Sequence, residues 1–278
     1  MDFAHTVGQA LHGAIAHGVT RLEAQLLLLH ALGHTSQERA WLLAHDDETL
    51  SITAQQGWRD ALTRRRAGEP VAYITGWAAF YGLELQVDAR VLCPRADTET
   101  LVDWALALLP LAAHVIDLGT GSGAVALALK HQRLDVHMHA RDISAEALAV
   151  ARANARRLGL EIEFSEGTWL EGLSEPFDAI VSNPPYIADA DPHLAALRHE
   201  PLNALNGGPD GLDDLRTIIA QAPACLKHGG WLLLEHGYDQ AAAVRQLLQA
   251  NGFIDVQSRQ DLAGIERCSG GRWAVSKT

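Results

Sequence analysis

The chain has 278 residues, 48% of them hydrophobic, and a formal net charge of −12 at pH 7. This length supports one large domain or a large and a small one, and the acidic balance argues against a protein that binds phosphate backbones through clustered Lys and Arg. Three widely separated cysteines argue against a disulfide framework. No signal peptide or apolar run long enough to span a bilayer stands out, so we expect a cytoplasmic protein without a membrane partner.

The first 70 residues predict a small helical domain. Three segments with the form Thr-x-x-Glu or Thr-x-x-Gln, which often begins a helix, start at Thr20, Thr35 and Thr53. Leucines between Leu22 and Leu29 recur at a spacing typical of a helical bundle core. The region ends near its only dense basic cluster, Arg64–Arg66. Two interpretations stay open for this cluster: a solvated helix end, or a contact to an acidic or RNA-bearing partner.

Residues 71–92 predict a β-hairpin that links the helical domain to the rest of the chain. The pattern is strand-like from Ala72 to Thr75 and alternates around single glycines as far as Val87. A helix is expected to begin at Thr98, after the segment that Pro94 opens. The remaining residues, 93–278, form the third predicted region.

A glycine-rich turn predicts a nucleotide-type site in this third region. The apolar run His114–Leu118 precedes Gly119-Thr-Gly-Ser-Gly123, and a helix-forming segment follows. Glycine lets a backbone approach a ligand closely, and a helix N-terminus offers free N–H groups. A second strand, Val136–Ala140, ends just before Asp142, about 20 residues past the turn, where a carboxylate can accept both hydroxyls of a ribose.

The third region alternates strands and helices, which predicts a parallel, doubly wound α/β sheet. The further strands expected are Glu161–Phe164, Asp178–Ser182 and Gly230–Glu235, followed by Phe253–Val256 and Arg272–Val275 as an antiparallel pair. The stretch from Ala188 to Gly211 is long and rich in Pro, Asp and Gly, and we expect it to form a flap on the substrate side.

The tetrapeptide Asn183-Pro-Pro-Tyr186 follows one of these strands and predicts a site for a planar nitrogen group. Two adjacent prolines fix φ and remove two backbone donors, so the turn is stiff. The side-chain oxygen of Asn183 and the carbonyl of Pro184 can accept two N–H groups, while the ring of Tyr186 covers the face of the substrate group. No acid directly follows to act as a base. A surface Pro-Pro turn is the alternative interpretation.

These motifs together resemble a known family. Asp117–Gly123, Asp142 and Asn183–Tyr186 resemble the class I S-adenosylmethionine (SAM)-dependent methyltransferases that modify amide or amino nitrogens, whose fold is a seven-stranded, Rossmann-like α/β domain. Further stretches resemble the peptide-chain release factor glutamine N5-methyltransferases; they are Pro94–Glu99, Glu200-Pro201, Gly207–Leu212 and Leu232–Gly237. The chain departs from the usual family pattern at Thr168, where an acid bordering the adenine is common, and at Ala96, where proline is common.

The resemblance implies methyl transfer from SAM to the side-chain amide of the glutamine in the Gly-Gly-Gln motif of class I release factors, which act in translation termination. The helical domain is expected to recognise this protein substrate. Adenine-N6 methylation of nucleic acid is the alternative, because its enzymes share the tetrapeptide, but the acidic balance argues against a stable nucleic-acid partner. A SAM-binding module without chemistry is a third interpretation, which the intact tetrapeptide disfavours.

The expected site residues follow from the motifs and the resemblance. We expect catalysis by Asn183, Pro184 and Tyr186, joined by Pro185 in the substrate site, and SAM contacts from Asp117, Gly119, Thr120, Gly121, Ser122, Gly123, Asp142, Trp169 and Asn183. Structural alternatives remain: Asp117 could orient the glycine loop, Trp169 could pack in the core, and Tyr186 could face inward. His137 and His139 share a strand face, but no further ligand pattern appears, so no metal site is predicted.

Overall fold

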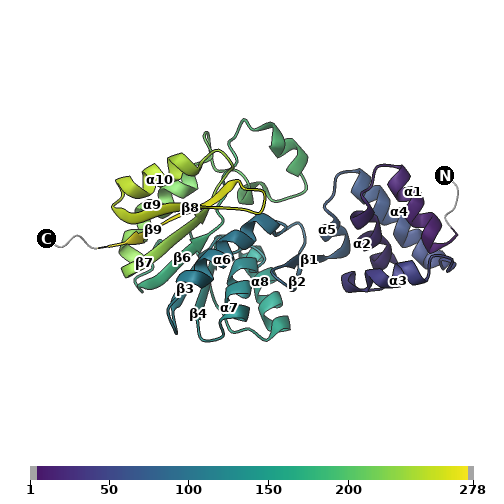
Figure 1. Ribbon diagram of the computed structural model, residues 1–278, viewed down its shortest axis with the longest axis horizontal. Coiled ribbons are helices and arrows are strands. Elements are labelled where there is room, and N and C mark those ends of the chain that lie inside the picture. The colour runs from purple at the N-terminus through teal and green to yellow at the C-terminus, as the bar shows by residue number, and fades with distance from the viewer. Residues whose placement is uncertain (1–4, 275–278) are drawn as a thin grey trace. The chain divides into compact units, whose positions relative to one another are not determined.

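The computed structural model describes residues 5–274, which divide into two compact units on either side of the bond between Trp77 and Ala78 (Figure 1). The smaller unit is helical, and the larger contains one seven-stranded sheet. No helix within residues 5–274 is long and apolar enough to cross a membrane.

The smaller unit is a helical bundle with its own core. Its elements are α1 (Val7–Ala16), α2 (Arg21–Leu32), the 3-10 helix η1 (Ser36–Glu38), α3 (Arg39–Ala44), α4 (Ile52–Arg66) and α5 (Val71–Thr75). Leu27, Leu28 and Trp58 are among the buried side chains of that core. The predicted face was partly wrong, because Leu22 is 50% exposed. Consecutive leucines do not define which face of a helix its neighbours will cover.

The helix starts in this unit follow hydrogen-bond chemistry. Thr20 caps α2 as predicted, since its side chain accepts from the backbone N–H of Glu23 while the Glu23 carboxylate accepts from Thr20. The start predicted at Thr53 is wrong, because Ser51 caps α4 and Thr53 lies inside the helix. Ser51 accepts from the N–H of Ala54, three residues on, which satisfies a donor of the first turn.

The segment Ala72–Thr75, predicted as strand-like, is part of helix α5. Pro70 precedes this helix, and Gly76 ends it with a φ of +81°, a conformation that favours glycine. The expected hairpin begins only after this glycine, with β1 (Trp77–Phe80) and β2 (Leu83–Gln86). The short helix was missed because β-branched and aromatic residues favoured a strand, while the proline and the glycine on either side define one helical turn and its end.

The larger unit confirms the predicted α/β fold. Its sheet has the order β5-β4-β3-β6-β7-β9-β8, and only β9 runs antiparallel to its neighbours β7 and β8. The strands are β3 (His114–Leu118), β4 (His137–Asp142), β5 (Glu163–Glu166), β6 (Phe177–Ser182), β7 (Leu226–Glu235), β8 (Phe253–Gln260) and β9 (Glu266–Trp273). The closing pair is longer than predicted, and Val275 lies outside the described residues.

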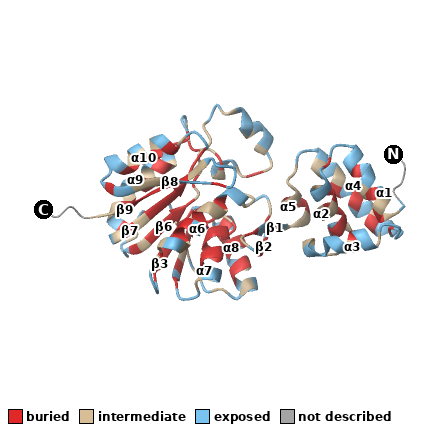
Figure 2. Cartoon of the chain, viewed as in Figure 1, coloured by how far each residue is buried: buried red, intermediate tan, exposed pale blue. Residues whose placement is uncertain are grey.

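Helices cover both faces of this sheet (Figure 1). The helical elements are η2 (Ala96–Thr98), α6 (Glu99–Leu108), α7 (Ala124–Gln132), α8 (Ala145–Leu158), η3 (Pro192–Leu197), η4 (Leu202–Ala204), α9 (Asp213–Cys225) and α10 (Ala241–Ala250). Val115 and Val181 pack in one core with α6 and α7, while their neighbours Ile116 and Ile180 pack in a second core with α9 and α10. The alternation of side chains along each strand thus supplies both cores, and Figure 2 shows the sheet buried between the layers.

A buried amide fastens the β-hairpin to the glycine loop. Asn154, on α8, is fully buried; its oxygen accepts from the N–H of Gln86 at 2.7 Å. Its nitrogen donates to the carbonyls of Gln86 and Ser122, both at 3.0 Å. One side chain therefore joins β2, α8 and the loop after β3, and all of its polar atoms are hydrogen-bonded.

Replacing Asn154 with Ala should destabilise the fold by about 2 kcal/mol, because three backbone groups lose a buried partner. Urea denaturation measures the change. The same substitution at exposed Asn251, whose side chain bonds the Leu247 carbonyl, is the matched control and should change stability far less. Equal effects at both positions would contradict the fastening role.

Candidate active site

The glycine loop and the tetrapeptide lie side by side because β3 and β6 are parallel neighbours. Leu118 and Ser182, the last residues of the two strands, are register partners. The Ser182 hydroxyl also donates to the Leu118 carbonyl at 2.7 Å, which fixes the two strand ends to each other. Gly119 and Asn183 therefore leave the sheet at the same point, where the chain order of the strands reverses.

The glycine loop is held from beneath by Asp117. Gly119, Gly121 and Gly123 all have positive φ, so glycine is the residue type that this turn requires. The Asp117 carboxylate, buried below the loop, accepts from the Thr120 hydroxyl at 2.6 Å and from the N–H of Ala126 at 3.2 Å. Burial raises the pKa of Asp117 to about 7, against the lowering effect of these hydrogen bonds. Its contacts are those of a residue that orients the loop.

Asp142 holds the same loop from the neighbouring strand. One carboxylate oxygen accepts from the N–H of Gly121 at 2.9 Å, and the other accepts from the N–H of Ser144 at 2.9 Å. Burial raises the pKa of Asp142, while these backbone donors oppose the rise. Each carboxylate oxygen has a second lone-pair direction, so the group can still accept from a ligand. The cap of the following helix is Ser144, whose hydroxyl accepts from Ala147.

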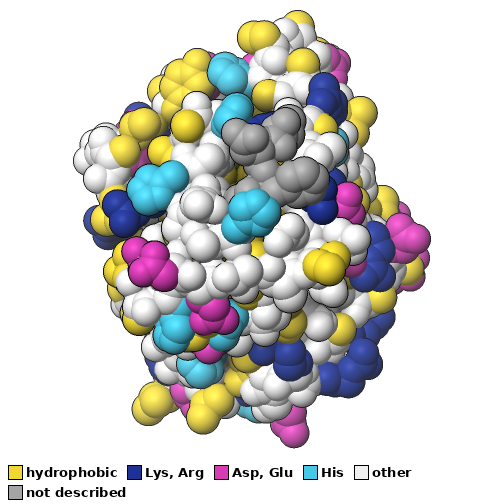
Figure 3. All heavy atoms as spheres, turned by 90° about the vertical axis from the view of Figure 1, so that its right-hand side faces the viewer, with side chains coloured by type: hydrophobic (Ala, Val, Ile, Leu, Met, Phe, Trp, Pro, Cys, Tyr) yellow, Lys and Arg dark blue, Asp and Glu magenta, His cyan; other side chains and the backbone are white. Residues whose placement is uncertain are grey.

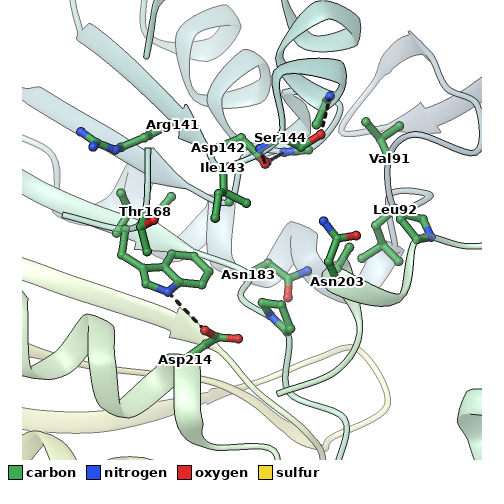
Figure 4. Close-up of a pocket in the computed structure, with 18 of the residues that line it drawn as sticks. Val91, Leu92, Arg141, Asp142, Ile143, Ser144, Thr168, Asn183, Asn203 and Asp214 are labelled. Atoms are coloured by element: carbon green, nitrogen blue, oxygen red, sulfur yellow. Dashed lines mark hydrogen bonds between the residues drawn. The ribbon is translucent and has the colours of Figure 1, made fainter. Parts of the chain in front are cut away.

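A cavity of about 300 Å³ opens at this edge of the sheet. In the view of Figure 4, Asp142 and Ser144 lie along its upper side, Asp214 lies below, and Asn183 and Asn203 lie between. Of the predicted site residues, it brings together Gly119, Gly121, Asp142, Trp169, Asn183 and Pro185. Thr168 lines it too.

A smaller cavity of about 50 Å³ is also lined by Asn183. Its lining adds Asp117, Thr120 and Ser122 from the predicted set and includes Pro94, Arg95 and Thr98 from the segment before α6. Asn183, Gly119 and Gly121 line both cavities. Neither lining includes Gly123, which lies before the first residue of α7 and faces Leu127 and Ala151.

Trp169 lines the larger cavity, and a hydrogen bond fixes its orientation. Its indole N–H donates to Asp214, the second residue of α9, at 3.2 Å (Figure 4). Its six-membered ring lies next to the Cα of Gly119, where an added Cβ would come within 3.3 Å. Burial raises the pKa of Asp214. The cavity therefore has a carboxylate at this edge although position 168 is a threonine.

The tetrapeptide is packed against the glycines of the Gly207–Leu212 segment. A Cβ on Gly207 would lie 2.6 Å from the Pro185 carbonyl oxygen. A Cβ on Gly211, which has a φ of +72°, would meet the carbonyl oxygen of Tyr186. The Gln240 side chain donates to that same Tyr186 oxygen at 3.0 Å. Two glycines and one amide thus hold the back of the turn.

The Tyr186 ring faces inward. Its hydroxyl donates to the buried Glu235 carboxylate at 3.2 Å, and the ring packs against the core that α9 and α10 cover. Burial and the Glu235 charge raise the pKa of the Tyr186 hydroxyl. Neither cavity lining includes Tyr186 or Pro184, and Pro184 is buried. These positions do not test the predicted substrate contacts, which remain predictions.

The flap is tied to the segment that precedes α6. Arg95 donates to Glu200 at 2.6 Å across 105 positions of sequence, and the Glu200 side chain is only 3% exposed. Pro201, Asn203 and Ala204, just beyond, line the larger cavity. The predicted flap therefore contributes to the site at its second half.

Sequence reasoning missed several of these partners as functional groups. Asp214 lacks any motif of its own, although the absence of an acid at position 168 could have prompted a search for another carboxylate. Thr98, Glu200 and Glu235 lie inside stretches that carried the family resemblance, but no pattern in the sequence pairs them with Asn183, Arg95 or Tyr186.

The sheet order, the glycine loop, the acid at the end of β4 and the tetrapeptide after β6 define a methyltransferase of the Rossmann-like class. Residues 98–200 match the family model described as "Methyltransferase small domain", and residues 9–76 match the "PrmC N-terminal domain". A methyltransferase structure from Pyrococcus furiosus shares the fold, with a TM-score of 0.56 at 18% identity over 78% of this chain and 98% of that one.

The sequence relatives are more specific. A release factor glutamine methyltransferase of Xylella fastidiosa is 48% identical, over 95% of this chain and 97% of its own. Another with that name, from Bordetella pertussis, is 48% identical over 91% of this chain and 95% of its own. The chain belongs to the release factor glutamine methyltransferase family.

Gly211→Ala should lower turnover strongly, because its Cβ would displace the Tyr186 carbonyl and with it the tetrapeptide. Gly159→Ala is the matched control: Gly159 has a similar φ of +66°, but nothing lies within 4 Å of its added Cβ. Both variants carry the cost of a left-handed alanine, about 1 kcal/mol. Methyl-transfer rates and thermal denaturation of both proteins separate the two effects, and equal turnover in the two variants would refute the steric argument.

Stability should also depend on pH through Asp117. Between its ordinary value of 3.8 and about 7, the folded protein holds a proton that the unfolded chain has lost. The free energy of unfolding should therefore fall as pH rises through this window and then level off. Asp117→Asn removes this contribution, so the stability of the variant relative to wild type should rise from pH 4 to pH 7. A difference that stays constant over this range would contradict the raised pKa.

Proposed function

We propose that the protein transfers a methyl group from SAM to the side-chain amide nitrogen, N5, of the glutamine in the Gly-Gly-Gln motif of class I release factors. The observation that carries the proposal is that Asn183 and the glycine loop together line both cavities. The names of the relatives support the choice of substrate. Translation termination takes place in the cytoplasm, which is where this function places the protein.

The residues of the two cavities fit SAM. Asp142 retains acceptor capacity toward the ribose hydroxyls, and Ile143 and Trp169 offer apolar surface to the purine. Asp214 offers a carboxylate near the Trp169 indole that can accept from the purine amino group. Thr168 cannot fill this role in the same way, because it has no carboxylate. The smaller cavity, with Asp117, Thr120 and Ser122, suits the amino-acid end. When bound, SAM would supply a methyl group that its positively charged sulfonium sulfur activates for transfer.

The protein then has to orient a weak nucleophile, the side-chain amide nitrogen of the substrate glutamine. The lone pair of an amide nitrogen is conjugated with its carbonyl, so the nitrogen attacks poorly unless it is positioned. Asn183 Oδ1 and the Pro184 carbonyl accept the two N–H groups of the glutamine, which turns its lone pair toward the methyl group. Tyr186 would cover the amide only after its ring leaves the Glu235 contact, so we assign its hydroxyl a role in holding the turn.

The proton balance needs no strong base. An N–CH3 bond forms as the S–CH3 bond breaks, which leaves S-adenosylhomocysteine, and the nitrogen loses one proton during or after attack. The nearest acids downstream of the tetrapeptide are Asp189, which is exposed, and Asp191, whose carboxylate caps η3 and contacts His193. Water can accept the proton, because the newly methylated amide nitrogen is strongly acidic while it is still protonated.

The smaller unit is proposed to recognise the protein substrate. It has its own core and matches the N-terminal family model, and both cavities are lined by residues from Phe80 to Asp214, outside it. Two of its three clustered arginines are paired, Arg64 with Glu69 and Arg65 with Glu23. These ion pairs favour the interpretation of a neutralised helix end over a contact to RNA.

Adenine-N6 methylation of nucleic acid remains the alternative that the same tetrapeptide allows. On the face that Figure 3 shows, several Lys and Arg side chains gather at the lower right, while acidic, histidine and hydrophobic side chains occupy much of the rest. The net charge of −12 argues against binding by extensive phosphate contacts.

The test is methyl transfer from labelled SAM to a purified release factor, to its Gln→Ala variant, and to duplex DNA and RNA. We expect label on the factor that disappears in the variant.

Asn183→Ala should lower turnover about 100-fold or more while SAM affinity changes by a few-fold, since an acceptor at the reacting nitrogen is lost. Asn251→Ala serves as the control with normal turnover. Label on nucleic acid would replace the proposal with the alternative, and full activity of Asn183→Ala would remove the proposed role of that side chain.

A further inference from the structure

The side-chain amide of Asn183 has two ends, and only one suits the proposed reaction. The oxygen accepts hydrogen bonds, whereas the nitrogen only donates them. A substrate amide nitrogen carries hydrogens, so it needs the oxygen; the NH2 group of Asn183 in the same place would repel it. Something in the protein therefore has to determine which end faces the cavities.

The hydroxyl of Thr98 holds the nitrogen end. Asn183 Nδ2 donates to Thr98 Oγ1 at 3.2 Å. Thr98 is only 4% exposed and lies at the junction of η2 and α6, so its position is fixed by packing. Among the described residues no hydrogen bond ends on Asn183 Oδ1, which leaves this oxygen for a ligand. A hydroxyl can donate as well as accept, however, so this contact alone would permit the reversed amide.

The buried side chain of Glu235, in its ionised form, favours one direction of this hydrogen bond. Glu235 is 1% exposed, and its Oε2 has no hydrogen-bond partner among the described residues. Burial raises the pKa of Glu235 to about 7, and hydrogen bonding by the Thr98 and Tyr186 side chains opposes the rise. An ionised carboxylate can only accept. When Thr98 directs its hydrogen to Glu235, its oxygen is left to accept from Asn183.

We propose that Thr98 and Glu235 are positioning residues that fix the Asn183 amide with its oxygen toward the substrate nitrogen. In this proposal the ionised Glu235 carboxylate would take the hydrogen of Thr98. The Thr98 oxygen then accepts a hydrogen of Asn183, in the contact that joins the two side chains at 3.2 Å. Glu235 also accepts from Tyr186, so one carboxylate orients both ends of the tetrapeptide. This inference rests on the proposed amide methylation and deepens it.

Thr98→Val, which keeps the shape of the side chain and removes the hydroxyl, should lower kcat about ten-fold, the rate equivalent of one lost hydrogen bond. SAM affinity and the KM for the release factor should change less than about two-fold, because neither depends on the direction of one amide. Thr98→Ser retains the hydroxyl and should restore most of the rate. Thr217→Val is the control for the same chemical change: Thr217 lies on α9, and its hydroxyl donates to the Asp213 carbonyl of the same helix.

A single-turnover comparison separates a positioning role from a merely structural one. If Thr98 acts through Asn183, Thr98→Val should add no further loss to the residual rate of Asn183→Ala. Losses that multiply in the double variant would overturn the inference, as would a Thr98→Val enzyme as fast as wild type.

A readout that needs no substrate distinguishes this inference from the proposed function. The side-chain NH2 signals of Asn183, assigned in a ¹⁵N spectrum by their absence in Asn183→Ala, should shift and exchange faster in Thr98→Val but not in Thr98→Ser. Unchanged signals in Thr98→Val would refute the hydrogen bond itself. If Thr98→Val shows these shifts but the wild-type enzyme labels no release factor, the hydrogen bond stands and the proposed function is contradicted.

Discussion

The meeting of parallel strand ends at one edge of the sheet is the constraint on which the rest of the site depends. The ends of β3, β4 and β6 carry the glycine loop, Asp142 and Asn183, and reversing any one of these strands would move its group to the opposite edge of the sheet. The chain builds β3, β4 and β5 outward and then returns to place β6 on the other side of β3. The crevice at this reversal is where open α/β sheets bind ligands.

Buried carboxyl groups fix the loops at this edge in place, and their burial costs electrostatic free energy. Asp117 lies under the glycine loop and Glu235 lies under the tetrapeptide, and burial raises the pKa of each to about 7. Two apolar residues of similar size would avoid that cost. They would also leave the Thr120 hydroxyl and the Tyr186 hydroxyl without acceptors. The two carboxyl groups therefore lower the free energy of unfolding at neutral pH, but they fix the orientation of the glycine loop and of the tetrapeptide.

The sequence was most informative where chemistry and local geometry coincide. Gly119 and Gly121 were predicted from a strand–turn–helix pattern, and their positive φ values show why the pattern needs glycine. Asp142 and Asn183 were predicted from their positions after strands, and both line the larger cavity. The alternation of strand-like and helix-like segments predicted seven strands, with errors at their ends that reach six residues at the start of β9 (Glu266–Trp273), which was predicted to begin at Arg272.

What the sequence did not reveal depends on long-range pairing. Asp214 meets Trp169 across 45 positions, and Asn183 meets Thr98 across 85. No local pattern encodes such distances, because they are set by how helices pack on the sheet. The error at Thr53 has the opposite cause: two residues nearby could both cap a helix, and packing of α4 selected Ser51.

The threonine at position 168 illustrates how a family site tolerates a change. An acid there would lie on the loop that follows β5, and its loss leaves Thr168 exposed at the cavity wall. Asp214 reaches the same wall from α9, and its bond to the Trp169 indole fixes both the ring and the carboxylate. A ligand that needs one acceptor and one flat apolar surface at this edge still finds both. Two different segments of a chain, the loop after β5 and the start of α9, can thus bring a carboxylate to the same cavity wall, and here the carboxylate comes from α9.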